Sequence, residues 1–422
     1  MERTTCCVVG GGPAGMMLGL LLARAGIDVT VLEKHADFLR DFRGDTVHPT
    51  TMQLLDDLGL GERFAALTQS RMEEVAFPAD AVGSGDGPPR MLRVGDFRRL
   101  ARVGVRHPYV AMVPQWDLLD LLADEARREP TFTLRTETEV LGLRRDGGRV
   151  TGVRYRTADG VEGEIAADLT VACDGRSSVV RAEADLPVTE YPCPMDAWWF
   201  RLPRRDGDTA SALSGRMGLG RFAVLIPRHD YFQIAYITRK GTDEALRERG
   251  IEAFRADVAE LVPEFADRVD AIPSMDDVKL LHVQLNRLER WHLDGLLCLG
   301  DAAHAMSPIG GVGINLAIQD AVAAASLLAG PLLRGAVRSR DLAAVRRRRF
   351  LPTALVQGLQ RLLHRMIVIP VLEGRRTAAP SGLRRVLQAL PAMSFVPAYL
   401  IGVGLRPERA PAFARREPAR AA

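Results

Sequence analysis

The sequence predicts an α/β protein in three parts: a parallel sheet with helices on its faces, an antiparallel sheet inserted into it, and a helical region at the C-terminus. Three observations predict this fold class. A glycine-rich turn joins an apolar strand-like run to a helix near the N-terminus, hairpin signals interrupt the middle of the chain, and Arg- and Leu-rich helical segments punctuated by proline follow residue 331.

The N-terminal segment predicts a βαβ unit. Residues 4–9 form an apolar run typical of a fully buried strand, residues 14–25 predict a helix that Gly26 ends, and residues 28–32 predict the next strand. Two strands joined through one helix in this way are parallel and the crossover is right-handed.

The middle of the chain predicts an antiparallel meander and then a second domain. Asp146-Gly147-Gly148 and Asp159-Gly160 are hairpin signals before a buried strand at 169–173. Strand-like segments at 198–202, 222–226 and 231–238 and one helical stretch at 243–261 follow. Residues 190–291 hold 11 of the 24 aromatic residues, which predicts either an aromatic-lined cavity or an ordinary aromatic sheet core.

These patterns predict the following domain boundaries. The first domain is discontinuous and comprises residues 1–75, 101–185 and 276–330. The inserted sheet domain comprises residues 76–100 and 186–275, and the basic helical region comprises residues 331–422.

Charge is distributed unevenly along the chain. The net charge is +3, but residues 334–422 carry 18 Arg and only 4 acidic residues. This basic region predicts helices whose arginines face water, with peripheral contact to anionic lipid or a homodimer interface as alternatives. No nucleic-acid-binding module accompanies the arginines. Five cysteines, mostly in apolar strand-like runs, and the lack of an uninterrupted apolar run of ~20 residues favour a cytoplasmic protein.

The glycine-rich turn has the spacing of a dinucleotide fingerprint. Gly10, Gly12 and Gly15 follow a strand and open a helix, so backbone N–H groups at the helix N-terminus can hold a pyrophosphate. An acidic residue at the end of the second strand can accept hydrogen bonds from a ribose. The cofactor-binding residues expected here are Gly10, Gly12, Pro13, Ala14, Gly15, Glu33 and Lys34.

Two later motifs follow predicted buried strands. Asp174-Gly175 precedes a cluster of Arg and Ser side chains, and Gly300-Asp301 places a carboxylate where it can accept hydrogen bonds from cofactor hydroxyls. Glycines beyond residue 301 allow the backbone to approach a flat ring, and the next helix can stabilise a negative charge. His304 is interpreted as a packed structural residue, and no metal spacing appears. The residues expected at this site are Asp174, Gly300, Asp301, Pro308, Gly310, Gly311, Gly313, Ile314 and Asn315.

Together these motifs resemble those of the group A flavin-dependent monooxygenases, the p-hydroxybenzoate hydroxylase type, over residues 1 to about 330. The resemblance implies a Rossmann-like FAD-binding domain and adds Arg43 and Gln115 to the expected FAD contacts. It also implies that NAD(P)H reduces the FAD, that O2 forms a flavin C4a-hydroperoxide, and that an aromatic or polycyclic small molecule is hydroxylated. The flavin carries the chemistry, with Pro308, Gly310 and Gly311 flanking it and no side chain expected as a catalytic group.

Two alternatives share the first fingerprint. One is a flavin-dependent reductase of prenyl double bonds, which needs no oxygen. The other is a non-catalytic isoprenoid-binding escort protein of the same fold, against which the Gly300-Asp301 motif argues.

Overall fold

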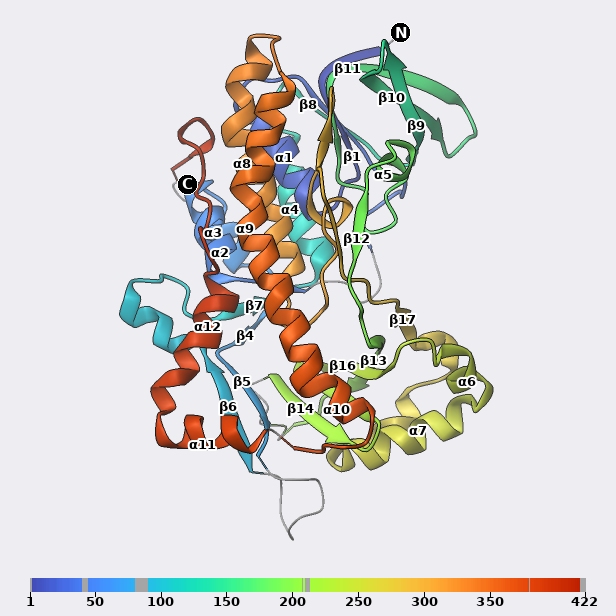
Figure 1. The fold of residues 1–422 in the computed structure, drawn as a ribbon, viewed down its shortest axis with the longest axis vertical. Helices are drawn as coiled ribbons and strands as arrows, with labels where there is room; N and C mark the ends of the chain where they lie inside the picture. Colours follow the sequence, from blue (N-terminus) through green and yellow to red (C-terminus); the bar gives the residue numbers. More distant parts are fainter. Residues whose placement is uncertain are drawn as a thin grey trace.

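The computed structural model describes residues 2–39, 45–79, 90–206, 208, 213–378 and 380–417. These residues form two lobes, with a mainly parallel sheet in one and a mainly antiparallel sheet in the other. The long helix α9 (Ser339–Leu363) runs past both lobes (Figure 1). The fold is α/β, as the sequence predicts.

The first sheet contains the predicted βαβ unit. Its central strands β20, β11, β1, β2 and β8 are parallel, and β9 and β10 extend β11 as the predicted antiparallel meander. The strand bounds are β19 (His292–Leu293), β20 (Leu296–Cys298), β11 (Glu162–Ala172), β1 (Glu2–Val9), β2 (Val29–Leu32), β8 (Phe132–Arg135), β9 (Thr138–Asp146) and β10 (Arg149–Thr157).

Apolar helices and short strands complete this lobe. Helix α1 is buried along almost its whole length and packs against α8 and α4, because small and aliphatic side chains cover all its faces. The helices are α1 (Pro13–Arg24), α2 (Pro49–Asp57), α3 (Gly61–Ala65), α4 (Gln115–Ala126), α5 (Val179–Glu183) and α8 (Gly313–Leu333), and the short strands are β3 (Thr46–Val47), β4 (Ser70–Met72), β7 (Val110–Met112), β12 (Val188–Glu190) and β18 (Asn286–Leu288).

Helix α8 is long and apolar enough to cross a membrane by length and composition, but 72% of its most apolar window is buried inside the protein. It is therefore accounted for as a core helix of the first lobe, whose apolar faces contact α1 and α9.

The second lobe is built on a seven-stranded sheet in the order β17-β13-β16-β15-β14-β5-β6. Strands from two distant parts of the chain meet where β14 pairs with β5 in parallel. The bounds are β17 (Lys279–Leu281), β13 (Met195–Pro203), β16 (Tyr231–Arg239), β15 (Arg221–Pro227), β14 (Leu213–Gly218), β5 (Glu74–Pro78) and β6 (Met91–Asp96). Strand β17 belongs to this sheet, although the expected boundary at residue 276 would assign it to the first domain.

Each face of this sheet has its own apolar cluster. The outer face, with Trp198, Phe200 and Tyr236, packs on helix α7 (Gly250–Leu261). The expected helix at 243–261 is in fact two helices, α6 (Asp243–Glu248) and α7, because Gly250 has a φ of 76° and interrupts the helical path. The inner face, with Trp199 and Val224, faces the other lobe.

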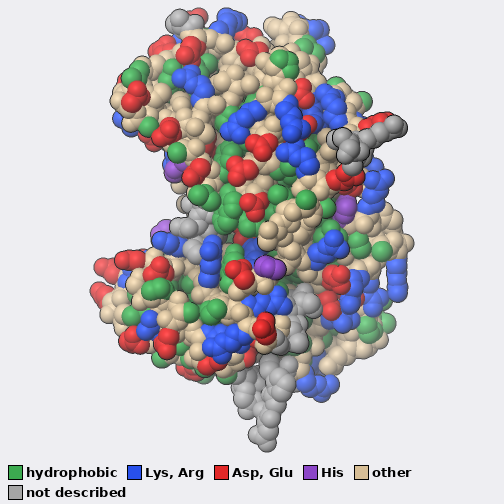
Figure 2. All heavy atoms as spheres, turned by 180° about the vertical axis from the view of Figure 1, so that it is seen from behind, with side chains coloured by type: hydrophobic (Ala, Val, Ile, Leu, Met, Phe, Trp, Pro, Cys, Tyr) green, Lys and Arg blue, Asp and Glu red, His purple; other side chains and the backbone are tan. Residues whose placement is uncertain are grey.

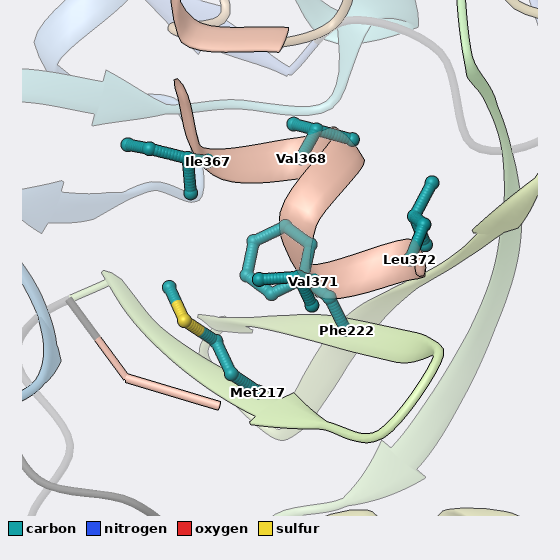
Figure 3. Close-up of a pocket in the computed structure, with 6 residues that line it drawn as sticks. All are labelled: Met217, Phe222, Ile367, Val368, Val371 and Leu372. Atoms are coloured by element: carbon teal, nitrogen blue, oxygen red, sulfur yellow. The ribbon is translucent and has the colours of Figure 1, made fainter. Parts of the chain in front are cut away.

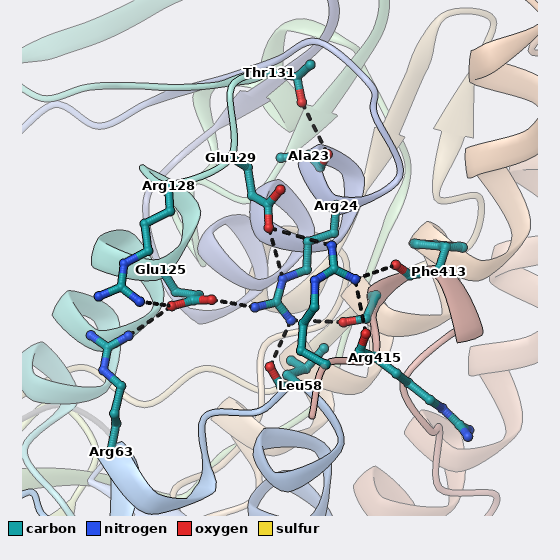
Figure 4. Close-up of polar contacts among 12 residues, drawn as sticks. Ala23, Arg24, Leu58, Arg63, Glu125, Arg128, Glu129, Thr131, Phe413 and Arg415 are labelled. Carbon is teal, nitrogen blue, oxygen red and sulfur yellow. Dashed lines mark hydrogen bonds and ion pairs between the residues drawn. The ribbon is translucent and has the colours of Figure 1, made fainter. Parts of the chain in front are cut away.

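The C-terminal region folds back over both lobes. After α9 comes a turn of π-helix (His364–Val368), then α10 (Ile369–Leu372), α11 (Ser381–Ala389) and α12 (Phe395–Gly402). The last described residues return to the first lobe, where the buried Arg24 donates to the carbonyl oxygens of Leu58 and Ala414, each at 2.9 Å, and pairs with Glu125 and Glu129 (Figure 4).

Candidate functional site

The glycine-rich turn lies at the carboxyl end of β1, beside the carboxyl end of β11. Gly10 has a φ of 100°, and a Cβ there would lie 2.6 Å from the carbonyl oxygen of Cys173. A Cβ on Gly15 would lie 2.0 Å from the carbonyl oxygen of Gly10. Both positions therefore require glycine for the turn to close against the neighbouring strand and helix.

The start of helix α1 is open. Gly12 is its N-cap residue, and a Cβ placed on Gly12 would meet no protein atom within 4 Å. Pro13 and Ala14 form the first turn, which contains no acidic residue, and no side chain caps the helix. The free N–H groups and the positive end of the helix dipole make this an anion-binding position suited to a pyrophosphate.

Glu33 directly follows β2, with its carboxylate beside this turn. It is buried, and its Oε2 accepts a hydrogen bond from the Gly11 N–H at 2.9 Å while Oε1 accepts one from the His35 N–H at 3.0 Å. These bonds fix the carboxylate at the edge of the open turn, where the sequence predicts a ribose. The next residue, Lys34, is exposed.

Asp174 and Asp301 follow the neighbouring strands β11 and β20. Asp174 turns one oxygen toward α5, where it accepts from the Val180 N–H at 3.3 Å, while its other oxygen is buried without a partner among the described residues. Burial raises the pKa of the Asp174 carboxyl. Asp301 pairs with Arg176, an arginine of the cluster that follows Asp174-Gly175, since Arg176 Nη2 is 3.2 Å from its Oδ2.

Beneath Asp301 lies a buried charged network that the motif alone does not indicate. Asp320 accepts from the Gly300 N–H at 3.3 Å, from Arg349 Nε at 2.9 Å, and lies 2.5 Å from His304 Nε2. Burial raises the pKa of a carboxyl, but His304 and Arg349 outweigh it and lower the pKa of Asp320. His304 is fully buried in this network, which agrees with its interpretation as a structural residue.

The segment Pro308–Gly313, called the flavin loop below, lies before helix α8. Gly310 and Gly311 have φ values of 85° and 60°. The loop is held by Thr46 in β3, whose hydroxyl donates to the Gly311 carbonyl oxygen at 2.7 Å, and a Cβ on Gly311 would lie 2.6 Å from that hydroxyl oxygen. A Cβ on Gly313 would meet no protein atom within 4 Å. The loop is therefore packed against β3 at Gly311, while the space beside Gly313, at the start of α8, is not filled by protein atoms.

Asn315 has a structural role that the sequence does not indicate. Its side chain donates to the Thr46 carbonyl oxygen at 3.0 Å and accepts from the His48 N–H at 2.9 Å and the Thr51 hydroxyl at 2.8 Å. Only its backbone is left for the expected cofactor contact. Ile314 lies beside it, partly exposed, in the first turn of α8, which contains no acidic residue.

A second polar group missed by the sequence analysis joins the two lobes beside the flavin loop. Asp45, next to Thr46, pairs with the buried Arg228 of the second lobe, and Arg228 also donates to Gln233. Burial raises the pKa of Asp45 although Arg228 and the Gln115 N–H act in the opposite direction. Gln115 thus starts α4 next to this pair. Arg43 lies outside the described residues.

The geometry fits a bound FAD. At Gly10, Gly15 and Gly311 the protein itself occupies the space of a side chain. At Gly12, Gly175 and Gly313 that space is open. Two helices start at the open positions without acidic first turns. Seen from behind, hydrophobic side chains gather in the hollow between the lobes (Figure 2). Among the described residues, no group of three or more His, Cys, Asp or Glu could hold a metal ion.

The fold and this site define a Rossmann-type FAD-binding protein. A second lobe, with a mainly antiparallel sheet, packs against the segment that precedes α8. Residues 3–358 match the model of the FAD binding domain family, and the chain belongs to that family. It is 38% identical to 6-methylpretetramide 4-monooxygenase of Streptomyces rimosus over 87% of this chain and 85% of that protein. Rifampicin monooxygenase of Streptomyces venezuelae is 28% identical over 74% of this chain and 61% of its own length.

Solved structures share this fold. The anhydrotetracycline hydroxylase of Streptomyces rimosus is 25% identical, with a TM-score of 0.73 over 95% of this chain and 76% of that chain. A probable FAD-dependent monooxygenase from Pseudomonas aeruginosa shares the fold, with a TM-score of 0.71 over 89% of this chain and 98% of that chain at 23% identity. The chain is an FAD-dependent monooxygenase, which confirms the prediction made from the three motifs.

Proposed function

We propose that this protein hydroxylates a fused-ring aromatic substrate of the tetracyclic polyketide type, using NAD(P)H as the reductant and O2 as the oxygen donor. The observation that carries this proposal is the 38% identity with 6-methylpretetramide 4-monooxygenase along nearly the whole of both chains. In this proposal FAD is held by the glycine turn, Glu33, the Asp174–Gly175 and Gly300–Asp301 turns, Gln115 and the flavin loop.

The inner face of the seven-stranded sheet is the proposed substrate wall. Trp199, Phe222 and Val224 lie on this face and pack in one apolar cluster with Ile309 of the flavin loop. The same cluster includes Val368 of the π-helical turn. A flat hydrophobic ring system placed here would lie between the sheet and the flavin loop, excluded from water.

A small apolar cavity marks an incompletely filled part of this wall. Its water-accessible volume is about 10 Å³, so it holds about one water-sized body. Its lining comes from strands β14 and β15 on one side and from the segment after α9 on the other (Figure 3): Met217, Phe222, Ile367, Val368, Val371 and Leu372. In this proposal a ring system enlarges the cavity by displacing these side chains.

FAD supplies the redox and oxygen-transfer chemistry when bound, and the chain supplies position and electrostatics. Thr46 and the closed glycines hold the flavin loop, and the N-terminus of α8 stabilises negative charge at the ring edge. Arg228 Nη1 is buried without a partner among the described residues, so it can donate to an acidic substrate hydroxyl. Asp45 beside it is the proposed acceptor of that hydroxyl proton.

The test uses purified holoenzyme, NADH or NADPH, and a panel of phenolic and tetracyclic substrates. We expect bound FAD, substrate-stimulated NAD(P)H oxidation, and a product that has gained one oxygen atom derived from O2. A protein that retains no FAD, turns over anaerobically, or releases only peroxide with every tetracyclic compound would contradict the proposal. Arg228→Met should raise KM or lower kcat about tenfold or more while FAD stays bound.

A further inference from the structure

From Arg349 onward, helix α9 and the turn after it carry polar side chains on the buried face and leucines on the exposed face, whereas the first turns of α9 bury Leu342 and Val345. Leu351, Leu355 and Leu362 are 41%, 46% and 49% exposed. Five polar side chains on the opposite face are each at most 2% exposed, and they follow the helix turn by turn: Arg349, Thr353, Gln357, Gln360 and His364. This arrangement inverts ordinary amphipathicity, and burying polar groups costs free energy unless they are bonded.

The side-chain amide of Gln360 hydrogen-bonds the backbone of Ser307 and that of Ile309 in the flavin loop. Its Nε2 donates to the carbonyl oxygens of Ser307 and Ile309 at 2.8 and 2.9 Å, and its Oε1 accepts from the Ser307 N–H at 3.2 Å. One helical turn later, His364 Nε2 lies 3.0 Å from the Ser307 hydroxyl oxygen. Ser307 is itself buried, so these bonds are shielded from water.

The same segment reaches the proposed substrate wall a few residues further on. His364 begins the π-helical turn, and Val368 at its end lines the apolar cavity with Val371 and Phe222 (Figure 3). A single π-helical turn inside a helix is often found at functional sites. One continuous piece of chain therefore contacts the flavin loop with its polar side chains and the substrate wall with its apolar ones.

We propose that Gln360 and His364 are positioning residues that couple occupancy of the apolar cavity to the position of the flavin loop. The inference rests on the proposed function, because the cavity is taken as part of the substrate wall. Thr46 holds the loop from the FAD-binding lobe, and Gln360 of α9 holds it at the Ile309 carbonyl oxygen. His364, in the π-helical turn after α9, contacts Ser307, the residue directly before the loop. A ring system pressing on Val368 shifts the turn that carries His364, and the bonds to Ser307 pass that shift to the loop.

The test compares Gln360→Met with Gln357→Met in the holoenzyme. The two variants make the same chemical change on the same buried face, but Gln357 donates instead to the Asn286 and Ala305 carbonyl oxygens, before the flavin loop. For Gln360→Met we expect full FAD content, a substrate-free NAD(P)H oxidation rate within about twofold of wild type, and a stimulation by substrate that falls about tenfold or more through kcat rather than KM.

A readout independent of turnover is the flavin absorption spectrum. Binding of a substrate or a non-reactive tetracyclic analogue perturbs the spectrum of the wild-type holoenzyme, and this perturbation should be reduced in Gln360→Met and retained in Gln357→Met. Ser307→Ala removes only the hydroxyl, which contacts His364 and accepts from the Ile309 N–H at 3.4 Å. It should show the same defect in weaker form, which keeps the proposal testable if Gln360→Met does not fold.

Three results would overturn the coupling: equal stimulation in Gln360→Met and wild type, equal losses in Gln360→Met and Gln357→Met, or an unchanged spectral perturbation in Gln360→Met and Ser307→Ala. Failure of the proposed function is distinguishable, because the wild-type protein would then show neither stimulation nor a spectral change with any tetracyclic compound.

Discussion

At the scale of single residues, the glycines of the cofactor site fall into two groups with different physical reasons. Gly10, Gly15 and Gly311 are glycine because the chain itself occupies the space of a side chain, whereas Gly12 and Gly313 face open space. No contact within the protein explains why glycine stands at the two positions of the second group. A bound cofactor that approaches the backbone closely supplies one.

This difference predicts opposite behaviour for two alanine variants. Gly12→Ala should leave the free energy of unfolding of the FAD-free protein within about 1 kcal/mol of wild type, the usual cost of alanine at an N-cap. It should weaken FAD binding about tenfold or more, because the new methyl group enters the cofactor's space. Gly10→Ala should destabilise the fold itself. Urea denaturation of the FAD-free proteins and fluorescence titration with FAD separate the two effects. Unchanged FAD affinity in Gly12→Ala would contradict the assignment of the turn at Gly12 to FAD binding.

Buried histidines predict a pH dependence of stability. Burial lowers the pKa of His48 and of His364 to about 4, from an ordinary value of 6.5. The unfolded chain therefore binds more protons than the folded chain between these pH values, so stability decreases as the pH falls below 6.5. Each histidine accounts for up to about 3 kcal/mol.

Denaturation midpoints measured at several pH values check this prediction. We expect the denaturant midpoint of the wild-type protein to decrease as the pH is lowered from about 6.5 toward about 4. His48→Gln should show a shallower decrease, because one of the buried histidines that titrate there is gone. A His48→Gln slope equal to that of wild type would show that His48 is not a neutral buried group.

At the scale of elements, helix α1 is joined to its neighbours by one buried cation. The Arg24 guanidinium is bonded to Glu125 of α4, to Glu129 just after α4 and to carbonyl oxygens of two other segments, while its own side chain is almost fully buried. Helix α1 thereby keeps its N-terminal turn aimed at the cofactor position while its C-terminal end is held by four partners (Figure 4).

Replacing this cation should therefore destabilise the protein. Arg24→Met keeps the apolar stem but removes one buried donor from Glu125 Oε1, Glu129 Oε1 and two carbonyl oxygens, and should cost about 3 kcal/mol. Thermal and urea unfolding measure the loss. Arg128→Met is the control, because Arg128 contacts Glu125 from an exposed position and should cost less than about 1 kcal/mol.

At the scale of the whole molecule, the C-terminal region is part of the fold and not an appendage. Glu408 pairs with Arg348 of α9, its N–H bonds Gln319 of α8, and the carbonyl oxygen of Ala414 accepts from Arg24. The arginines that the sequence places in a basic tail are in part bound to acidic groups of the protein.

Deleting all residues after Gly404 should lower the thermal unfolding temperature and accelerate FAD loss. The deletion removes Glu408 from the network of Arg349 and Asp320 that supports the Gly300 turn, so both effects share one cause. Glu408→Gln should reproduce part of the FAD loss with the chain intact. A truncated protein with wild-type unfolding temperature and FAD release rate would contradict this account.

Much of the FAD-binding lobe could be predicted because its signals are local. The strand, turn and helix around Gly10 follow one another directly, and their spacing determines a βαβ unit. The helix expected at 243–261 shows the limit of this approach, since the apolar periodicity continues through Gly250 although the helix does not.

The sequence by itself determined the class of fold and the cofactor turns, because short-range patterns of glycine, acid and apolar residues specify them. Only the tertiary structure brought Asp45 to Arg228, Thr46 to Gly311, and Gln360 to Ser307 and Ile309. These pairs are separated by tens to hundreds of residues, and each depends on how two lobes and a returning helix pack, which no local pattern encodes.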